Sequence, residues 1–459
     1  MLLRHPTFLL CGLLLADAGP AAAQFAGGQR PSTDLRLDLG QMYSLDDATD
    51  RHLSYSELRG SIDGRRDVAG GRVELHIDGR GRYTWTDVST NRLDLTRANV
   101  VFGAADAGWS VALGRMSVDA VASARVDGAS VDVRLIPELH LIAFGGLMPH
   151  PVDGSPNVDF LSFGVGYDAR HASIEHAGGV ALNLYKGGLD RLYATERFYW
   201  RISPMWQLHG FMILDFVGVS GLLGDLALLP PDQQSSLQKI DLTSADLTLR
   251  FAPLKQLDFA LSGSHNHTLL PNLWWQDFIA EERVRRGFVL DGPQPVGTRR
   301  TNARLVMNVH ITPSVTPYIR GRFDARFEDG KKGYEGAVGL KLDDVDLGYI
   351  DISGTVRSLF GNENELVGLA AGTSFANALG LDVTVNGLRV VLAPDPNNAA
   401  ASAGPQLLLD VGASAWLDMK VLAPALGDLR LMATYQAFIA SDLTFQAGFV
   451  RIGYRFRDV

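Results

Sequence analysis

The stretch RVELHIDGRGRYTWT, residues 72–86, alternates without a break between two kinds of side chain. Its even positions carry Arg, Glu, His, Asp and Thr, while its odd positions are apolar, aromatic or glycine. A period of two is that of a β-strand whose two faces meet different surroundings. The stretch therefore predicts a long strand with one polar and one apolar face.

The length of such runs distinguishes two environments. Residues 300–312 and 318–328 repeat the alternation, so the runs span 11 to 15 residues. Strands of soluble proteins usually have ~5 to 6 residues, whereas a tilted strand that crosses a bilayer needs ~9 to 11. The most apolar segment, residues 211–229, contains Asp215 and Asp225 and does not fit a membrane helix. Without apolar helices, a closed barrel is the way to satisfy backbone groups in lipid.

Composition excludes other classes of protein. The chain has 459 residues, of which 46% are hydrophobic and 20% charged, so it is not intrinsically disordered. Its 42 basic and 51 acidic residues give a net charge of −9, which predicts no nucleic-acid partner. Residues 1–23 combine Arg4, an apolar run and Ala21-Ala22-Ala23, as in a secretory signal peptide. The single cysteine, Cys11, lies in that segment, and the barrel is expected over residues 24–459.

Connection lengths and chain ends complete the predicted architecture. Short turns near residues 203–205, 252–256 and 312–315 alternate with long connections such as 218–238 and 270–297, as periplasmic turns and outer loops do. We expect all-β structure, a single closed antiparallel transmembrane β-barrel of about 18–22 strands, the higher number requiring an opening hairpin over 34–63. The last strand ends in the aromatic Phe456 and resembles the signal read by barrel-assembly machinery, an expected partner beside outer-membrane lipid.

Aromatic residues near the expected strand ends are candidates for the interfacial girdles of such a barrel. They include Tyr83, Trp85, Trp109, Trp206 and Tyr318.

Arginine dominates the polar face that would line the lumen. The candidate pore-lining residues are Arg80, Arg82, Arg300, Arg304, Arg320, Arg322, Arg326, Arg451 and Arg455. A guanidinium stays charged and forms forked hydrogen bonds, so such a row can bind anions or pair with carboxylates. In the first interpretation the arginines favour anionic solutes at a constriction. In the second they form a bracing charge ladder with Glu74, Asp78, Asp94, Asp324 and Asp351.

One short motif points to a family. Leu113-Gly114-Arg115-Met116, followed by Val126-Asp127-Gly128-Ala129-Ser130-Val131, resembles the Gly-Arg-Gln and Asp-Gly-Ala pattern of porin-like barrels of the alginate-export type, with Met116 where that pattern has Gln. The resemblance covers about 20 residues. It implies a large monomeric barrel with an arginine-rich pore for an anionic polysaccharide. The alternative is that Arg115 and Asp127 form a lumenal ion pair at a strand end.

Two histidines carry the alternative of an enzyme. Ser262-Gly263-Ser264-His265-Asn266-His267 is the dense cluster of chemically active side chains, and His265 and His267 share a strand face. They could bind a metal or activate a nucleophile, but two histidines on a polar face are more often solvated. We therefore expect no catalytic residue, no metal site and no cofactor.

These patterns together predict a multi-pass protein of a bacterial outer membrane. The favoured function is a porin-like channel for passive passage or export of polar solutes, including anionic ones. A closed barrel whose outer loops bind a ligand, and less favourably an outer-membrane hydrolase, are the alternatives.

Overall fold

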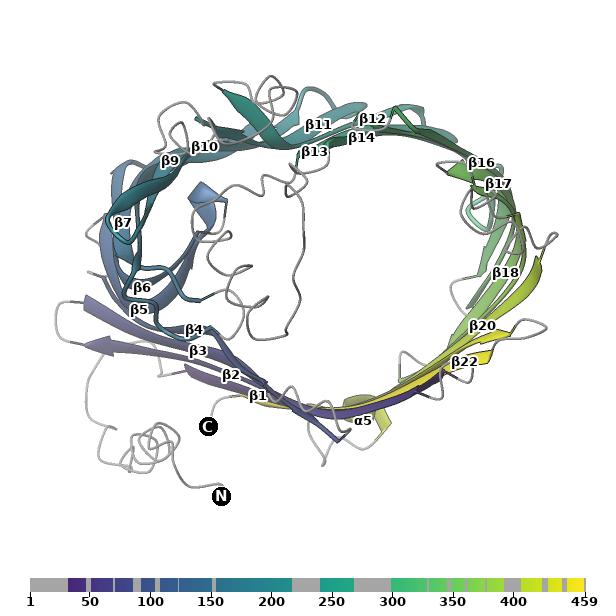
Figure 1. The fold of residues 1–459 in the computed structure, drawn as a ribbon, viewed down its shortest axis with the longest axis horizontal. Helices are drawn as coiled ribbons and strands as arrows, with labels where there is room; N and C mark the ends of the chain where they lie inside the picture. The colour runs from purple at the N-terminus through teal and green to yellow at the C-terminus, as the bar shows by residue number, and fades with distance from the viewer. Residues whose placement is uncertain are drawn as a thin grey trace, which may run out of the picture.

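A computed structural model gives the fold of the chain, drawn in Figure 1. It describes residues 32–46, 51–68, 71–85, 92–103, 108–122, 124–150, 154–216, 240–267, 299–327, 330–344, 348–359, 362–375, 378–391, 406–422, 428–439 and 444–457. The expected signal peptide and the long connections 218–238 and 270–297 lie outside the described residues. Within the described residues, no helix is both long and apolar enough to cross a membrane.

The described chain is almost entirely β-structure. The strands are β1 (Ser32–Asp46), β2 (Arg51–Val68), β3 (Gly71–Thr84), β4 (Arg92–Gly103), β5 (Trp109–Val118), β6 (Ala124–Ile136), β7 (Leu139–Leu147), β8 (Phe160–His171), β9 (Ile174–Tyr185), β10 (Gly188–Arg201), β11 (Trp206–Asp215), β12 (Asp241–Leu254), β13 (Leu257–His267), β14 (Arg299–Val309), β15 (Val315–Arg326), β16 (Lys332–Asp344), β17 (Gly348–Leu359), β18 (Asn362–Phe375), β19 (Leu379–Val391), β20 (Gln406–Asp418), β21 (Asp428–Ile439) and β22 (Thr444–Arg457). Two short helices, η2 (Asp119–Val121) and α5 (Met419–Leu422), interrupt them.

The strands form one closed antiparallel barrel of 22 strands. Each strand pairs with its neighbours in the sequence, and β1 closes the ring against β22, where Leu39 is the register partner of Ile452. The opening hairpin predicted over 34–63 is present as β1 and β2, which confirms the higher strand count. With an even number of antiparallel strands, the start of β1 and the end of β22 lie on the same side of the membrane.

The outer surface of the barrel is apolar. Large side chains at alternate positions are exposed because no part of the described chain covers them, for example Leu305 (48%), Ile319 (49%) and Val338 (60%). In water such a surface would be costly, whereas in hydrocarbon it is solvated favourably. The predicted transmembrane barrel is therefore confirmed, and this architecture places the protein in a bacterial outer membrane.

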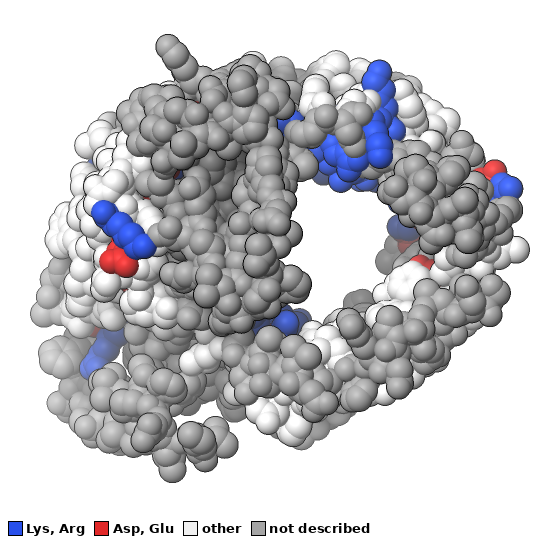
Figure 2. All heavy atoms as spheres, viewed as in Figure 1, with Lys and Arg blue, Asp and Glu red and all other residues white. Residues whose placement is uncertain are grey.

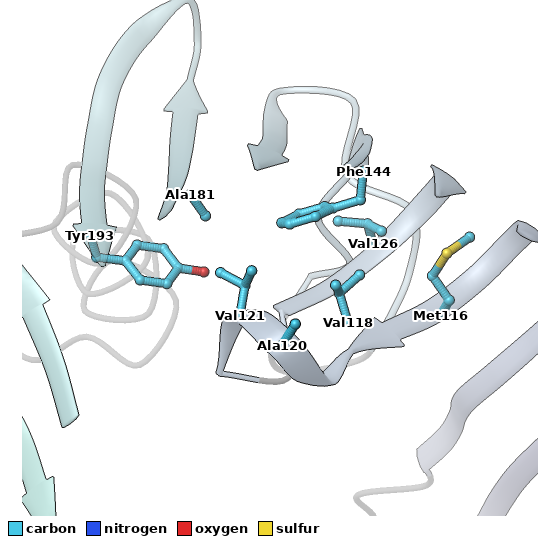
Figure 3. Packing of buried hydrophobic residues seen from close by; sticks show 8 residues of the cluster. All are labelled: Met116, Val118, Ala120, Val121, Val126, Phe144, Ala181 and Tyr193. Atoms are coloured by element: carbon cyan, nitrogen blue, oxygen red, sulfur yellow. The ribbon is translucent and has the colours of Figure 1, made fainter. Parts of the chain in front are cut away.

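The apolar cluster that is fully buried lies on the other side of the wall. It combines residues of β5, β6 and η2 with residues of β7, β9 and β10 (Figure 3). Its members are Met116, Val118, Ala120, Val121, Val126, Phe144, Ala181 and Tyr193. Because η2 contacts β8, β9 and β10, the hairpin formed by β5 and β6 folds into the ring.

Candidate functional site: the lumenal wall

The predicted arginines lie on the strand face opposite the apolar belt. Arg320 and Arg322 alternate with the exposed Ile319 and Phe323 along β15, and the same alternation applies to β14. Seen down the ring, an opening passes through the molecule and basic side chains lie along its upper right border (Figure 2). The strand period alone sets this orientation, because successive side chains point to opposite faces.

Five of the nine candidates gather on two neighbouring strands, and we call them the arginine cluster. They are Arg300, Arg304, Arg320, Arg322 and Arg326. Arg304 is the register partner of Arg322, and Arg300 that of Arg326. The cluster therefore joins like charges across the β14–β15 ladder, a pairing that is destabilising unless anions or carboxylates offset it.

Two carboxylates lie within the cluster. Asp324 is completely buried and accepts a hydrogen bond of 2.8 Å from Arg300, while its other oxygen lies 2.7 Å from Nε of Arg322. Glu335 on β16 is the register partner of Arg322. Among the described residues, Arg304 and Arg320 form no ion pair with a carboxylate, so this part of the wall keeps positive charge that no described partner neutralises.

Arg320 lies over the ring of Tyr318, with its guanidinium carbon 4.3 Å from the ring centroid. Tyr318 donates a hydrogen bond of 2.7 Å to Asp351 on β17. The prediction that Tyr318 belongs to an interfacial girdle is therefore wrong. Its even position directs it to the arginine face, where it presents an aromatic surface to Arg320 in a cation–π contact.

The wall formed by β22 and β1 to β4 has a different balance of charge. Arg451 pairs with Asp38 at 2.7 Å, Arg82 with Glu57 at 3.1 Å and Arg80 with Asp94 at 3.3 Å. Further ion pairs join Arg36 to Asp38, Arg59 to Glu57 and Arg455 to Asp34. Four of these six ion pairs join neighbouring strands, as the charge-ladder interpretation expects. Of the carboxylates that it named, Asp94 takes part here, whereas Asp324 pairs with Arg300 and Arg322 in the arginine cluster.

The inward hairpin is the element that sequence reasoning missed. The pairing between β4 and β5 ends at Arg115, and beyond this residue β5 leaves β4. Gly114 has a φ of +115°, and a Cβ there would lie 2.3 Å from the carbonyl oxygen of Ala98. Glycine permits this conformation and close approach, which redirect the strand into the ring. A signal existed in the sequence, since apolar Met116, Val118 and Val126 disturb the expected polar lumenal face.

A glycine recess in the wall accommodates the tip of the hairpin. Val121 is completely buried, and its Cγ2 lies 3.0 Å from the Cβ position of Gly166 and 2.8 Å from that of Gly179. These glycines are register partners on β8 and β9, so together they leave a depression one side chain deep. Thr195 on β10 adds a hydrogen bond of 3.3 Å to the carbonyl of Ala120.

The motif that carried the family resemblance lies at the base of this hairpin. Arg115 donates two hydrogen bonds to Asp127, of 2.6 and 2.5 Å, and a third of 2.9 Å to the carbonyl of Leu95. Arg115 is 7% exposed. The ion pair offered as the alternative interpretation of these residues is therefore present, and it links β4, β5 and β6 where the hairpin leaves the wall.

The serines of the histidine cluster lie on the strand face opposite to the two histidines. His265 alternates with Ser264 along β13, so the two side chains lie on opposite faces, and His265 contacts Thr301 at 2.7 Å. His267 is buried and hydrogen-bonded to Asp241, an acid partner that the sequence did not reveal. Within the described part of the chain, no three metal-ligating side chains come together.

Similarity to known proteins is found for the structure of the chain and not for its sequence. No family model matches the chain, and no curated protein matches it. Among solved structures, Pseudomonas aeruginosa OpdQ shares 7% identity with a TM-score of 0.45, covering 94% of this chain and 100% of that one. Pseudomonas aeruginosa OccD3 (OpdP) shares 9%, with a TM-score of 0.43 over 93% and 92% of the two chains. Acinetobacter baumannii OccAB4 shares 8%, with a TM-score of 0.43 over 94% and 98%. The resemblance to the alginate-export type stays a prediction.

Proposed function

We propose that this protein is an outer-membrane channel through which polar solutes diffuse, with a preference for anions. The observation that carries the proposal is the arginine cluster on the lumenal face of β14 and β15, in which Arg304 and Arg320 have no ion pair with a described carboxylate. A guanidinium does not lose its proton in a protein, so this positive charge persists at any physiological pH.

The local field of the cluster outweighs the net charge of the whole chain. The Debye length is about 8 Å at physiological ionic strength, so distant acidic residues are screened from a solute beside β15. On the opposite wall each arginine of the ladder lies within ion-pair distance of one of four carboxylates, Asp34, Asp38, Glu57 and Asp94, and this contact weakens its field. A passing anion therefore meets its strongest attraction at the arginine cluster.

The inward hairpin gives the passage its asymmetry. It occupies the lumen in front of β8, β9 and β10, while basic side chains border the opening that Figure 2 shows. By narrowing a wide barrel, the hairpin makes solutes pass closer to the charged wall. Proximity strengthens selectivity because Coulomb interactions in water decline with distance and screening.

Planar-bilayer recording of the purified protein tests the proposal. We expect discrete conductance steps and a reversal potential that reports anion preference under a salt gradient. Arg320→Glu should lower the anion-to-cation permeability ratio, and the Arg320→Glu/Arg322→Glu double variant should erase or reverse it. Arg389→Glu is the matched control, since Arg389 pairs with Glu365 on the outer face and the substitution changes charge equally.

The other outcomes correspond to the alternatives. An electrically silent barrel would contradict the channel and favour a closed scaffold whose loops bind a ligand. Conductance that is indifferent to the Arg320 and Arg322 substitutions would contradict the anion preference. Hydrolysis of lipid or peptide substrates that disappears in His265→Ala would favour the enzyme.

A further inference from the structure

A carboxylate lies on the lipid-facing side of the barrel. Glu196 is eight residues after the start of β10 and five before its end, so it lies within the span rather than at the rim. Its neighbour Thr195 contacts the inward hairpin, which fixes the opposite, outward direction of Glu196. Ionisable groups in this position are expensive, and they usually mark a functional contact.

The depth of Glu196 follows from the strand geometry. Trp200 lies on the same face and is 39% exposed. It is four residues closer to the β10–β11 turn, at the end of the strand where aromatic side chains meet the membrane interface. With a rise of ~3.4 Å per residue and a tilt of ~40°, Glu196 is roughly 10 Å from the level of Trp200. Glu365, another carboxylate on the outer face, differs from Glu196 in depth and in partner. It lies three residues from the start of β18 and pairs with Arg389 at 3.3 Å.

Glu196 belongs to a polar cluster that spans three strands. Tyr167 on β8 donates a hydrogen bond of 2.6 Å to Glu196, and Nδ1 of His176 on β9 lies 3.6 Å from its other oxygen. Gly178 lies between Tyr167 and Glu196 in the register of the sheet. A Cβ at Gly178 would be 2.3 Å from Oε2 of Glu196, so the glycine leaves the room in which the two side chains meet.

The cluster has unused hydrogen-bonding capacity toward the outside. Its carboxylate is 25% and its imidazole 42% exposed, and Nδ1 of His176 makes the contacts to Tyr167 and Glu196. An imidazole ring has a second nitrogen, and an ionised carboxylate accepts several hydrogen bonds. Hydrocarbon offers neither a donor nor an acceptor, so lipid tails leave this capacity unsatisfied.

We propose that this face, which we define by Tyr167, His176, Gly178 and Glu196, binds a second copy of the same chain. A two-fold axis along the membrane normal at β9 sets β8 of one copy opposite β10 of the other. Nε2 of His176, as donor, then faces Glu196 of the second copy, and the contact repeats symmetrically. The face is thus self-complementary in charge and hydrogen bonding.

Cysteine cross-linking in outer-membrane vesicles tests this proposal, which does not depend on whether the barrel conducts. The only cysteine of the chain is Cys11, in the expected signal peptide, so a single introduced cysteine reports one position. Val180 is on the same face of β9 and 43% exposed, and V180C should yield a disulfide-linked dimer under mild oxidation. V338C, on the outer face of β16 and 60% exposed, is the matched control and should remain monomeric.

The polar cluster itself is tested in the V180C background. E196L should lower the cross-linked fraction by about 10-fold, the factor expected for losing two symmetry-related hydrogen bonds in a membrane. Since removing a carboxylate from lipid does not threaten barrel formation, monomer yield provides the folding control, and E196Q should retain an intermediate dimer fraction. Equal cross-linking of V180C and V338C, no cross-linking of V180C, or no response to E196L would each overturn the proposal.

Discussion

A single substitution can weaken the packing that holds the hairpin of β5 and β6 inside the lumen. Val121→Ala removes two methyl groups from a side chain that is completely buried between η2 and the glycine recess. At about 0.8 kcal/mol for each group, the substitution costs about 1.6 kcal/mol of packing. If this packing holds the hairpin in the lumen, the ratio of displaced to seated hairpin rises by about 15-fold.

Single-channel recording measures this shift. We expect V121A to visit a state of larger conductance about 15-fold more often than the wild type. Gly179→Ala should have a stronger effect, because its Cβ would lie 2.8 Å from Val121 and 2.4 Å from the carbonyl oxygen of Val165, and backbone cannot yield cheaply. Leu305→Ala, an exposed residue of the outer face, is the control for a general loss of stability.

A disulfide provides the reverse perturbation. The Cβ position of Gly166 lies 3.1 Å from Cβ of Ala120, slightly below the usual separation of ~3.5 to 4.5 Å for bonded cysteines. Ala120→Cys/Gly166→Cys should therefore lock the hairpin and abolish visits to the larger state until a reductant is added. Unchanged conductance in V121A, in G179A and in the oxidised double cysteine variant would refute the reasoning that this hairpin narrows the passage.

Three further outcomes are expected. Raising KCl from 0.1 M to 1 M shortens the Debye length from about 10 Å to about 3 Å, so the anion-to-cation permeability ratio should fall toward that of the free ions, and a constant ratio would argue against electrostatic selection. Asp324→Asn removes the carboxylate shared by Arg300 and Arg322, and it should cost about 1–3 kcal/mol in urea unfolding while increasing anion preference; a loss of preference would contradict the role of the cluster. Phe456→Ala should reduce the folded fraction delivered by barrel-assembly machinery in vivo without changing the conductance of the refolded protein, as judged by heat-modifiable electrophoretic mobility, and normal assembly would exclude Phe456 from the recognised signal.

The alternation of side chains made the barrel predictable. In residues 72–86 and 300–312 the alternation by itself indicates which face of the strand meets lipid, because a period of two is a local property of extended backbone. The opening hairpin was harder to recognise, since Arg51–Val68 mixes Gly, Ser and charged residues with few apolar ones. Its hydrogen bonds to β1 and β3 hold it in the sheet, although its own sequence pattern is a weak signal for a strand.

Partners across strands could not be read from the chain. The residue type of Tyr318 predicts a place in a girdle, yet its hydrogen bond to Asp351 requires the register of β15, β16 and β17. The contact between Tyr167 and Glu196, 29 positions apart, depends equally on the register through Gly178. Register is a collective result of turns and neighbouring strands, so no single segment specifies it.

The sequence by itself determined the class of structure, the number of strands within a narrow range and the face on which the arginines lie. The tertiary structure decided which of these arginines are neutralised, because Arg82 meets Glu57 across β2 and β3 whereas Arg304 meets Arg322 across β14 and β15. It also decided that Val121 folds into the lumen, since that depends on Gly166 and Gly179 standing opposite it. The physical reason is that periodicity follows from the local backbone, whereas charge balance and packing depend on what ring closure brings together.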